Sequence, residues 1–147
     1  MLNPKKTAKE CYLNSKGIVK SYFSDLDAGK YKVKLTTPYN LPDIYVPIKI
    51  TKAKTIVKAP AVANNFKKSK YFKLTLKNKA TKKAVSKIKV KVKVFTGKKS
   101  KVYTVKTNKK GVGYLNTNKL SKGLHKVVIT SGNKNYKISA KSSITIK

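Results

Sequence analysis

The residue types that carry most protein chemistry are scarce in this chain. It has one cysteine, Cys11, one histidine, His125, and four carboxylates among its 147 residues. A catalytic thiol needs a base beside it, and a zinc site needs three or four suitable ligands together. Cys11 and His125 lie far apart in the sequence. We therefore expect no enzyme, no cofactor and no metal centre.

Lysine is the residue type that the chain has in excess. All 37 basic residues are Lys, and the formal net charge is +33. The four acids are Glu10, Asp25, Asp27 and Asp43, so the 28 lysines from residue 51 onward share their segment with no acidic side chain. Solubility and protection of strand edges would need far fewer lysines. This density of charge predicts a surface for a polyanion, and a bound polyanion should also stabilise the fold.

The clearest structural pattern is the strict alternation of Lys with Ile or Val over residues 87–94. A period of two predicts a strand with one apolar face and one lysine face. The lysines of this row, together with those that come next along the chain, are the candidate polyanion-binding residues. These are Lys87, Lys89, Lys91, Lys93, Lys98, Lys99 and Lys101.

Further strand patterns follow one another with turn signals between them. They cover residues 71–76, 101–106, 112–115, 123–130 and 136–146, and Pro47 suggests that the strand 44–50 lies at a sheet edge. The turn at 107–111 predicts a positive φ at Gly111. No amphipathic helix, no transmembrane segment and no signal peptide is expected. The fold class is all-β, an immunoglobulin-like antiparallel β-sandwich.

An internal repeat organises the chain. Residues 14–36 resemble residues 108–130 at an offset of 94, and 48–50 resemble 144–146 at an offset of 96. About 95 residues is the size of an immunoglobulin-like domain. We predict that residues 53–147 form a complete sandwich and that 1–52 form the second half of another. The alternative, a small independent hairpin unit in residues 1–52, stays open.

The repeat also assigns structural roles to the few chemically active residues. Cys11 aligns with Val105, which predicts a small buried side chain, and His125 aligns with Tyr31, which predicts a packed or surface ring. Asp25 and Asp27 could bind calcium between domains. The equivalent region around Asn118 and Ser121 has no carboxylate, which disfavours that site.

Residues 120–146 resemble the end of a bacterial-Ig-like repeat: a leucine, a glycine, an alternating strand, a polar turn, a tyrosine and a final strand. Residues 102–111 resemble the hairpin that precedes this ending. The nearest likeness is to repeats in adhesin-like surface proteins of methanogenic archaea, over all of 54–147 and part of 11–52. The resemblance implies an extracellular, non-enzymatic stalk, spacer or adhesion module. The extreme charge and the lack of a signal peptide depart from that family.

Charge and resemblance together predict a structural and adhesive cell-surface module that holds to an anionic cell-wall or surface polymer. Its other partners would be neighbouring Ig-like repeats of a longer parent chain. The alternative is sequence-nonspecific nucleic-acid binding, with Tyr71, Tyr103, Tyr114 and Phe95 as stacking platforms. The absence of Arg and of any nucleic-acid motif disfavours this alternative, and we expect these aromatic rings to pack on the sheets instead.

Overall fold

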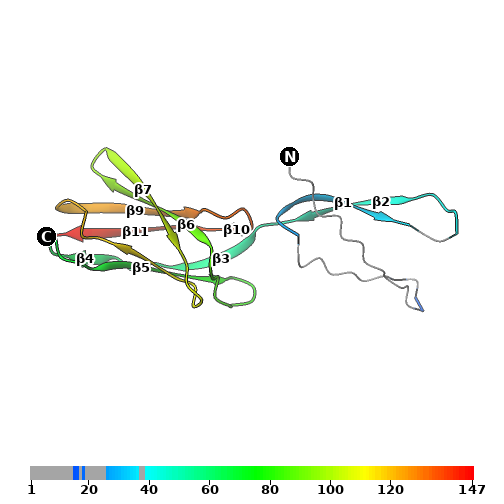
Figure 1. Ribbon diagram of the computed structural model, residues 1–147, viewed down its shortest axis with the longest axis horizontal. Coiled ribbons are helices and arrows are strands. Elements are labelled where there is room, and N and C mark those ends of the chain that lie inside the picture. The colour runs from blue at the N-terminus through cyan, green and yellow to red at the C-terminus, as the bar shows by residue number, and fades with distance from the viewer. Residues whose placement is uncertain (1–14, 17, 19–25, 37–38) are drawn as a thin grey trace.

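The computed structural model describes residues 15–16, 18, 26–36 and 39–147, and all regular elements within these ranges are β-strands. Strands β1 (Gly29–Leu35) and β2 (Ile44–Ile50) form an antiparallel hairpin, and the nine later strands form two further sheets. The hairpin lies at one end of the molecule and the C-terminus at the opposite end (Figure 1). None of the described residues belongs to a helix that could cross a membrane.

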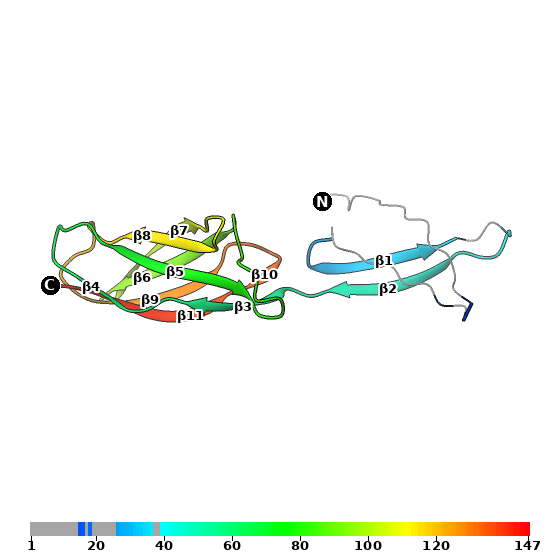
Figure 2. The same ribbon diagram turned by 90° about the horizontal axis from the view of Figure 1, so that it is seen from below.

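Two sheets pack face to face to form the body of the protein (Figure 2). The four-stranded sheet has the order β10 (Tyr136–Lys137), β3 (Ala53–Lys58), β5 (Tyr71–Asn78) and β8 (Val112–Asn116). The five-stranded sheet has the order β4 (Val62–Asn64), β11 (Ser139–Ile146), β9 (Gly123–Ser131), β6 (Lys89–Thr96) and β7 (Lys99–Lys106). The predicted all-β sandwich is confirmed.

Both end strands of the sandwich change sheets part-way. The first runs in one sheet as β3 and continues in the other as β4, and the last does the same as β10 and β11. These two strands pair in parallel, β10 with β3 and β11 with β4, whereas the other pairings are antiparallel. Counted as continuous strands they give seven, the number typical of an immunoglobulin-like sandwich.

Alternating apolar residues of both sheets form the core. Phe72, Leu74 and Leu76 of β5 are fully buried, and Val90 and Val92 of β6 meet them from the other sheet in one apolar cluster. Burial of each such side chain contributes about 1.5–3 kcal/mol. The buried face predicted for the alternating segment 87–94 is therefore confirmed.

The start of that segment differs from the prediction. Strand β6 begins at Lys89, and Lys87 lies before it with a φ of 57°. Thr107 causes the difference, because its buried hydroxyl donates to the carbonyl of Val85 and accepts from the amide of Ile88. Lys87 also donates its amide to the carbonyl of Thr107. These bonds hold the chain in a bend that alternation alone does not reveal.

The turn after β7 follows the prediction, because Gly111 has a φ of 72°. A Cβ atom at this position would lie 2.5 Å from the carbonyl oxygen of Leu76. The amide of Leu76 donates a hydrogen bond to the carbonyl of Gly111. Only glycine combines this backbone conformation with such a close approach.

The hairpin has one apolar face and one lysine face. Its apolar face carries Tyr31, Val33, Leu35, Ile44, Val46, Ile48 and Ile50, which pair across the strands. Its other face carries Lys30, Lys32, Lys34, Tyr45, Pro47 and Lys49. Strand β2 pairs only with β1 among the described residues, which agrees with the edge position that Pro47 suggested.

The hairpin repeats the pairing of β9 with β11. Gly29 faces Ile50 in the hairpin, and Gly123 faces Ile146 at the corresponding place in the sandwich. The equivalents of the hairpin's apolar residues in β9 and β11 are inward-facing residues such as Val127 and Ile144, which are buried. In the hairpin, by contrast, Leu35 and Val46 remain 47% and 40% exposed.

Candidate functional site

The outer side of the five-stranded sheet carries an ordered array of lysines, which we call the lysine face. Its members are exposed side chains that share one side of the sheet by strand register. They are Lys89, Lys91 and Lys93 of β6, Lys106 of β7, Lys126 of β9 and Lys141 of β11.

Strand register sets the spacing of the lysine face. Lys89 lies directly opposite Lys106, and Val128 separates Lys93 from Lys141 across two strand spacings. Neighbouring lysines of β6 are about 7 Å apart, and their repulsion costs about 0.6 kcal/mol per pair in water. The buried residues beneath fix the backbone, so the points from which the lysine side chains project are held in a fixed array.

No side-chain ion pair among the described residues neutralises a member of the lysine face. The described residues contain two, Lys34 with Asp43 at 2.8 Å and Lys134 with Asp27 at 2.6 Å, and neither pair involves the lysine face. Lys93 has one further contact, with its ammonium 5.1 Å from the centre of the Phe95 ring. That contact leaves the positive charge in place. The face is therefore suited to a ligand that brings several negative charges.

The seven lysines proposed from the sequence do not share one surface. Lys89, Lys91 and Lys93 lie on the lysine face, whereas Lys101 pairs with the inward-facing Val94 and so projects from the other side of the sheet. Lys99 lies two residues before Lys101 on the same strand, so it projects from the same side of the sheet as Lys101. Lys98 follows Gly97 in the tight turn between β6 and β7, and Lys87 precedes the strand.

Three members of the lysine face were missing from the sequence prediction. Lys106, Lys126 and Lys141 all belong to expected strands, and Lys126 adjoins the buried Val127. Alternation gives their facing within each strand. It does not say which strands are neighbours, and that information comes from the pairing of β6 with β7 and β9 and of β9 with β11.

The outer side of the four-stranded sheet also carries exposed lysines, and it differs in having aromatic rings among them. These lysines are Lys54, Lys58, Lys73, Lys77 and Lys137. Tyr71 of β5 and Tyr114 of β8 are 55% and 51% exposed. Their ring centres lie 6.0 Å apart, and the ring planes make an angle of 80°. Of the rings expected to pack on the sheets, Tyr103 packs against the core cluster, whereas Tyr71 and Tyr114 pack against each other on the outer surface and stay half-exposed.

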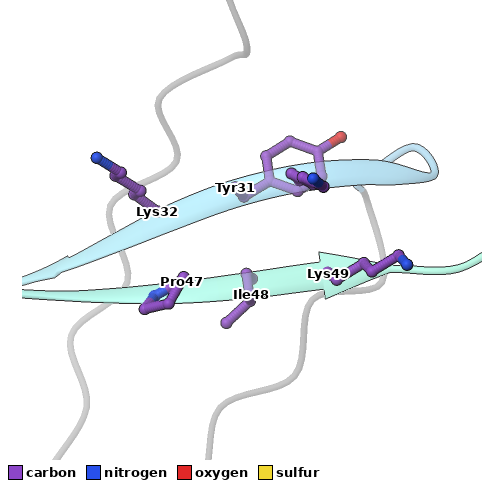
Figure 3. A pocket seen from close by; sticks show the side chains of 6 residues that line it. Tyr31, Lys32, Pro47, Ile48 and Lys49 are labelled. Carbon is purple, nitrogen blue, oxygen red and sulfur yellow. The ribbon is translucent and has the colours of Figure 1, made fainter.

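An open hollow of about 390 Å³ lies on the hairpin (Figure 3). Its lining residues are Lys30, Tyr31, Lys32, Pro47, Ile48 and Lys49. Tyr31 donates its hydroxyl to the carbonyl of Asp27 at 2.8 Å, which fixes the ring beside the start of β1. The hollow combines cations with apolar surface, and the described residues that line it include no carboxylate.

His125 is a structural residue in this fold. Its ring is 1% exposed, and Nε2 lies 2.8 Å from the carbonyl oxygen of Ser121. Nδ1 lies 3.1 Å from the hydroxyl of Thr96 and 3.1 Å from the carbonyl of Phe95. These contacts agree with the packed ring that the sequence suggested. Within the described ranges no group of three or more His, Cys, Asp or Glu gathers to hold a metal ion.

Replacement of His125 with Ala should destabilise the sandwich by about 3 kcal/mol, because it leaves a cavity and unpaired polar groups around it. Urea unfolding of the two proteins measures this difference. The matched control is Leu124→Ala, since the adjacent Leu124 is 63% exposed and should lose less than about 1 kcal/mol. Equal losses for the two variants would contradict the structural role of His125.

Asp27 joins the hairpin to the sandwich. Its carboxylate pairs with Lys134 and accepts a hydrogen bond from the side-chain amide of Asn135 at 2.7 Å. Asn135 also accepts from the amide of Ala28 through its side chain and from the amide of Ala53 through its backbone. The calcium hypothesis named Asp27 with Asp25. Both carboxylate oxygens of Asp27 are bound by these partners. Asp25, like Cys11, lies outside the described residues.

This contact should depend on pH. The hydrogen bonds from Lys134 and Asn135 lower the pKa of Asp27, and Asp27 raises the pKa of Lys134. Because the pKa of Asp27 is lower in the folded protein, the contact is fully formed above the ordinary Asp pKa. It is lost as the pH falls through the lower pKa of the folded state. Because the pKa of Lys134 is higher in the folded protein, the contact is fully formed below the ordinary Lys pKa. It is lost as the pH rises through the higher pKa of the folded state.

We therefore expect the hairpin and the sandwich to tumble together between about pH 4 and pH 10, and to separate only as the pH falls well below the ordinary Asp value. Nitrogen-15 relaxation of the full chain measures this as two diverging correlation times. Asp27→Asn should show the divergence already at pH 7. A single correlation time for Asp27→Asn at pH 7 would refute the role of this ion pair.

No protein-family model and no curated protein matches the sequence. The geometry and charge of the described residues therefore carry the functional argument.

Proposed function

We propose that this chain is a non-enzymatic cell-surface module with a structural and adhesive role, which holds to anionic cell-envelope polymers. The observation that carries this proposal is the lysine face, six exposed lysines on one rigid sheet surface. A polyanion laid across it gains several ion pairs at once and releases its counterions. Since the chain has no acidic side chain after Asp43, little internal neutralisation competes with such a ligand.

The arrangement along the molecule supports a spacer role. The hairpin and the C-terminus lie at opposite ends of the sandwich (Figure 1), so repeats of this kind would follow one another as a rod. The contact between Asp27 and the loop at Lys134 and Asn135 would set the angle between successive units.

The hairpin supports neighbouring repeats as partners. Its apolar face corresponds, residue by residue, to the inward face that β9 and β11 turn toward the core. In the complete unit that inward face is covered by strands such as β5, with Phe72 and Leu74. We propose that the natural cover of the hairpin is a set of strands with the same inward Phe and Leu pattern, from the first half of a repeat.

Thermal unfolding with and without polygalacturonate tests the proposed function, with the neutral polymer dextran as control. A ligand that binds only the folded state at 100 times its dissociation constant adds about 2.7 kcal/mol of stability. We expect polygalacturonate to raise the melting temperature at low salt and dextran to leave it unchanged. An equal response to both polymers, or to neither, would refute binding through charge.

A further inference from the structure

The tyrosine pair, Tyr71 with Tyr114, is surrounded by polar and cationic groups in an ordered way. Lys73 follows Tyr71 on the same face of β5 and lies directly opposite Tyr114 of β8. Asn116 lies opposite Tyr71, and its side-chain amide donates to the hydroxyl of Ser69 at 3.2 Å. Two half-exposed rings, a lysine, an amide and a hydroxyl are therefore neighbours on one face at the edge of the sheet.

Two adjacent exposed tyrosine rings are stronger evidence for a ligand-binding surface than a single exposed apolar residue is. A tyrosine ring is a large apolar surface, and two adjacent rings left half-exposed form a patch among charged neighbours. Among the described residues, the aromatic contact that each ring makes is with the other.

The angle between the rings indicates the shape of the ligand. The planes make an angle of 80°, so the two rings form a corner rather than a row of parallel platforms, and this arrangement suits a single ring-sized group better than a run of stacked ones. Consecutive stacked bases need platforms that lie parallel and in line, and this pair does not provide them. The face of a pyranose presents C–H groups of slight positive charge, which suit the negative face of a tyrosine ring.

We infer that Tyr71, Tyr114 and Lys73 form a binding site for the uronic acid units of an acidic polysaccharide. The sugar ring stacks in the tyrosine corner, its carboxylate pairs with Lys73, and Asn116 and Ser69 bind its hydroxyl groups. This inference rests on the proposed function and deepens it. The lysine face attracts any polyanion, whereas the tyrosine pair distinguishes a polymer that contains sugar rings.

The test compares two polyanions that differ in the presence of a ring, polygalacturonate and polyglutamate, with the full chain. The double variant Tyr71→Thr/Tyr114→Thr removes the rings, places β-branched residues that suit strands at these exposed positions and leaves the charge unchanged. We expect it to bind polygalacturonate about tenfold more weakly, since an aromatic contact of this kind is worth about one power of ten. Its affinity for polyglutamate should change less than twofold, and the salt dependence of both should stay the same.

A second variant, Tyr71→Phe/Tyr114→Phe, keeps the rings and is the control for misfolding caused by substitution at these positions. It should retain polygalacturonate binding within about twofold, and the melting temperatures of both variants confirm the fold. Loss of binding in the Phe variant would overturn stacking as the mechanism.

The remaining outcomes separate this inference from the proposed function. Unchanged polygalacturonate binding in the Thr variant, or an equal loss for both polymers, overturns the tyrosine site and leaves polyanion binding intact. A larger loss for single-stranded DNA than for polygalacturonate overturns it in favour of nucleic acid. A wild-type chain that binds neither polymer overturns the proposed function itself.

Discussion

The triple variant Lys89→Gln/Lys91→Gln/Lys93→Gln should bind polyanions far more weakly than the wild-type chain. These three side chains stand on one strand at the centre of the lysine face, between β7 and β9. For duplex DNA, each contacting lysine adds about 0.9 to the slope of log affinity against log salt. Removal of three should lower that slope by about 3 and the affinity at 0.1 M salt by about 100-fold.

The matched control is Lys79→Gln/Lys82→Gln/Lys83→Gln, which removes the same charge from the segment between β5 and β6. All three residues are exposed, and they lie outside the sheet surfaces. Fluorescence titration at four salt concentrations measures both slopes. If the control lowers the slope as much as the β6 variant, net charge governs binding, and the lysine face has no special role.

Leu74→Ala should cause the largest loss of stability, about 3–4 kcal/mol. Leu74 is fully buried in the middle of β5 and packs against Gly113 across the strand pair. Truncation removes the transfer free energy of three carbons and leaves a cavity that a close-packed sandwich cannot close. Urea unfolding monitored by tyrosine fluorescence gives the difference in the free energy of unfolding.

Lys73→Ala is the control for this prediction, since Lys73 is the next residue on the same strand and points to solvent. It should change stability by less than about 0.5 kcal/mol. A loss at Lys73 that equals the loss at Leu74 would mean that β5 does not have the inward and outward faces described above.

Much of the fold follows from local sequence pattern. The alternation in segment 87–94 gives the inner and outer faces of β6, because strand side chains have a strict period of two. Gly111 has the positive φ that the turn signal predicted. Such features depend on neighbours in the sequence, and those neighbours are visible without a structure.

Features that depend on strand pairing were less accessible. Lys101 looks like a continuation of the row that ends at Lys93, yet the register of β6 with β7 places the two on opposite sides of the sheet. The bend at Lys87 depends on Thr107, which is remote in the sequence. The sheet changes from β3 to β4 and from β10 to β11 likewise arise from tertiary packing.

The aromatic residues show the same limit. Tyr103 and Tyr114 both stand in strand patterns, but one packs against the core and the other is half-exposed. Their facing depends on which side of each strand meets the opposite sheet, and the apolar pattern around Tyr114 is weak because Gly113 occupies an inward position. A small inward residue hides the alternation that would reveal the facing.

The most direct test of the central claim is the binding of the purified full chain to isolated cell-wall material and to duplex DNA, side by side across a salt series. Attraction by charge alone should fall steeply with salt for DNA. Our account predicts that wall binding persists at salt concentrations where DNA binding has been lost. Loss of both at the same modest salt concentration would contradict it and would leave a cationic spacer without an envelope ligand.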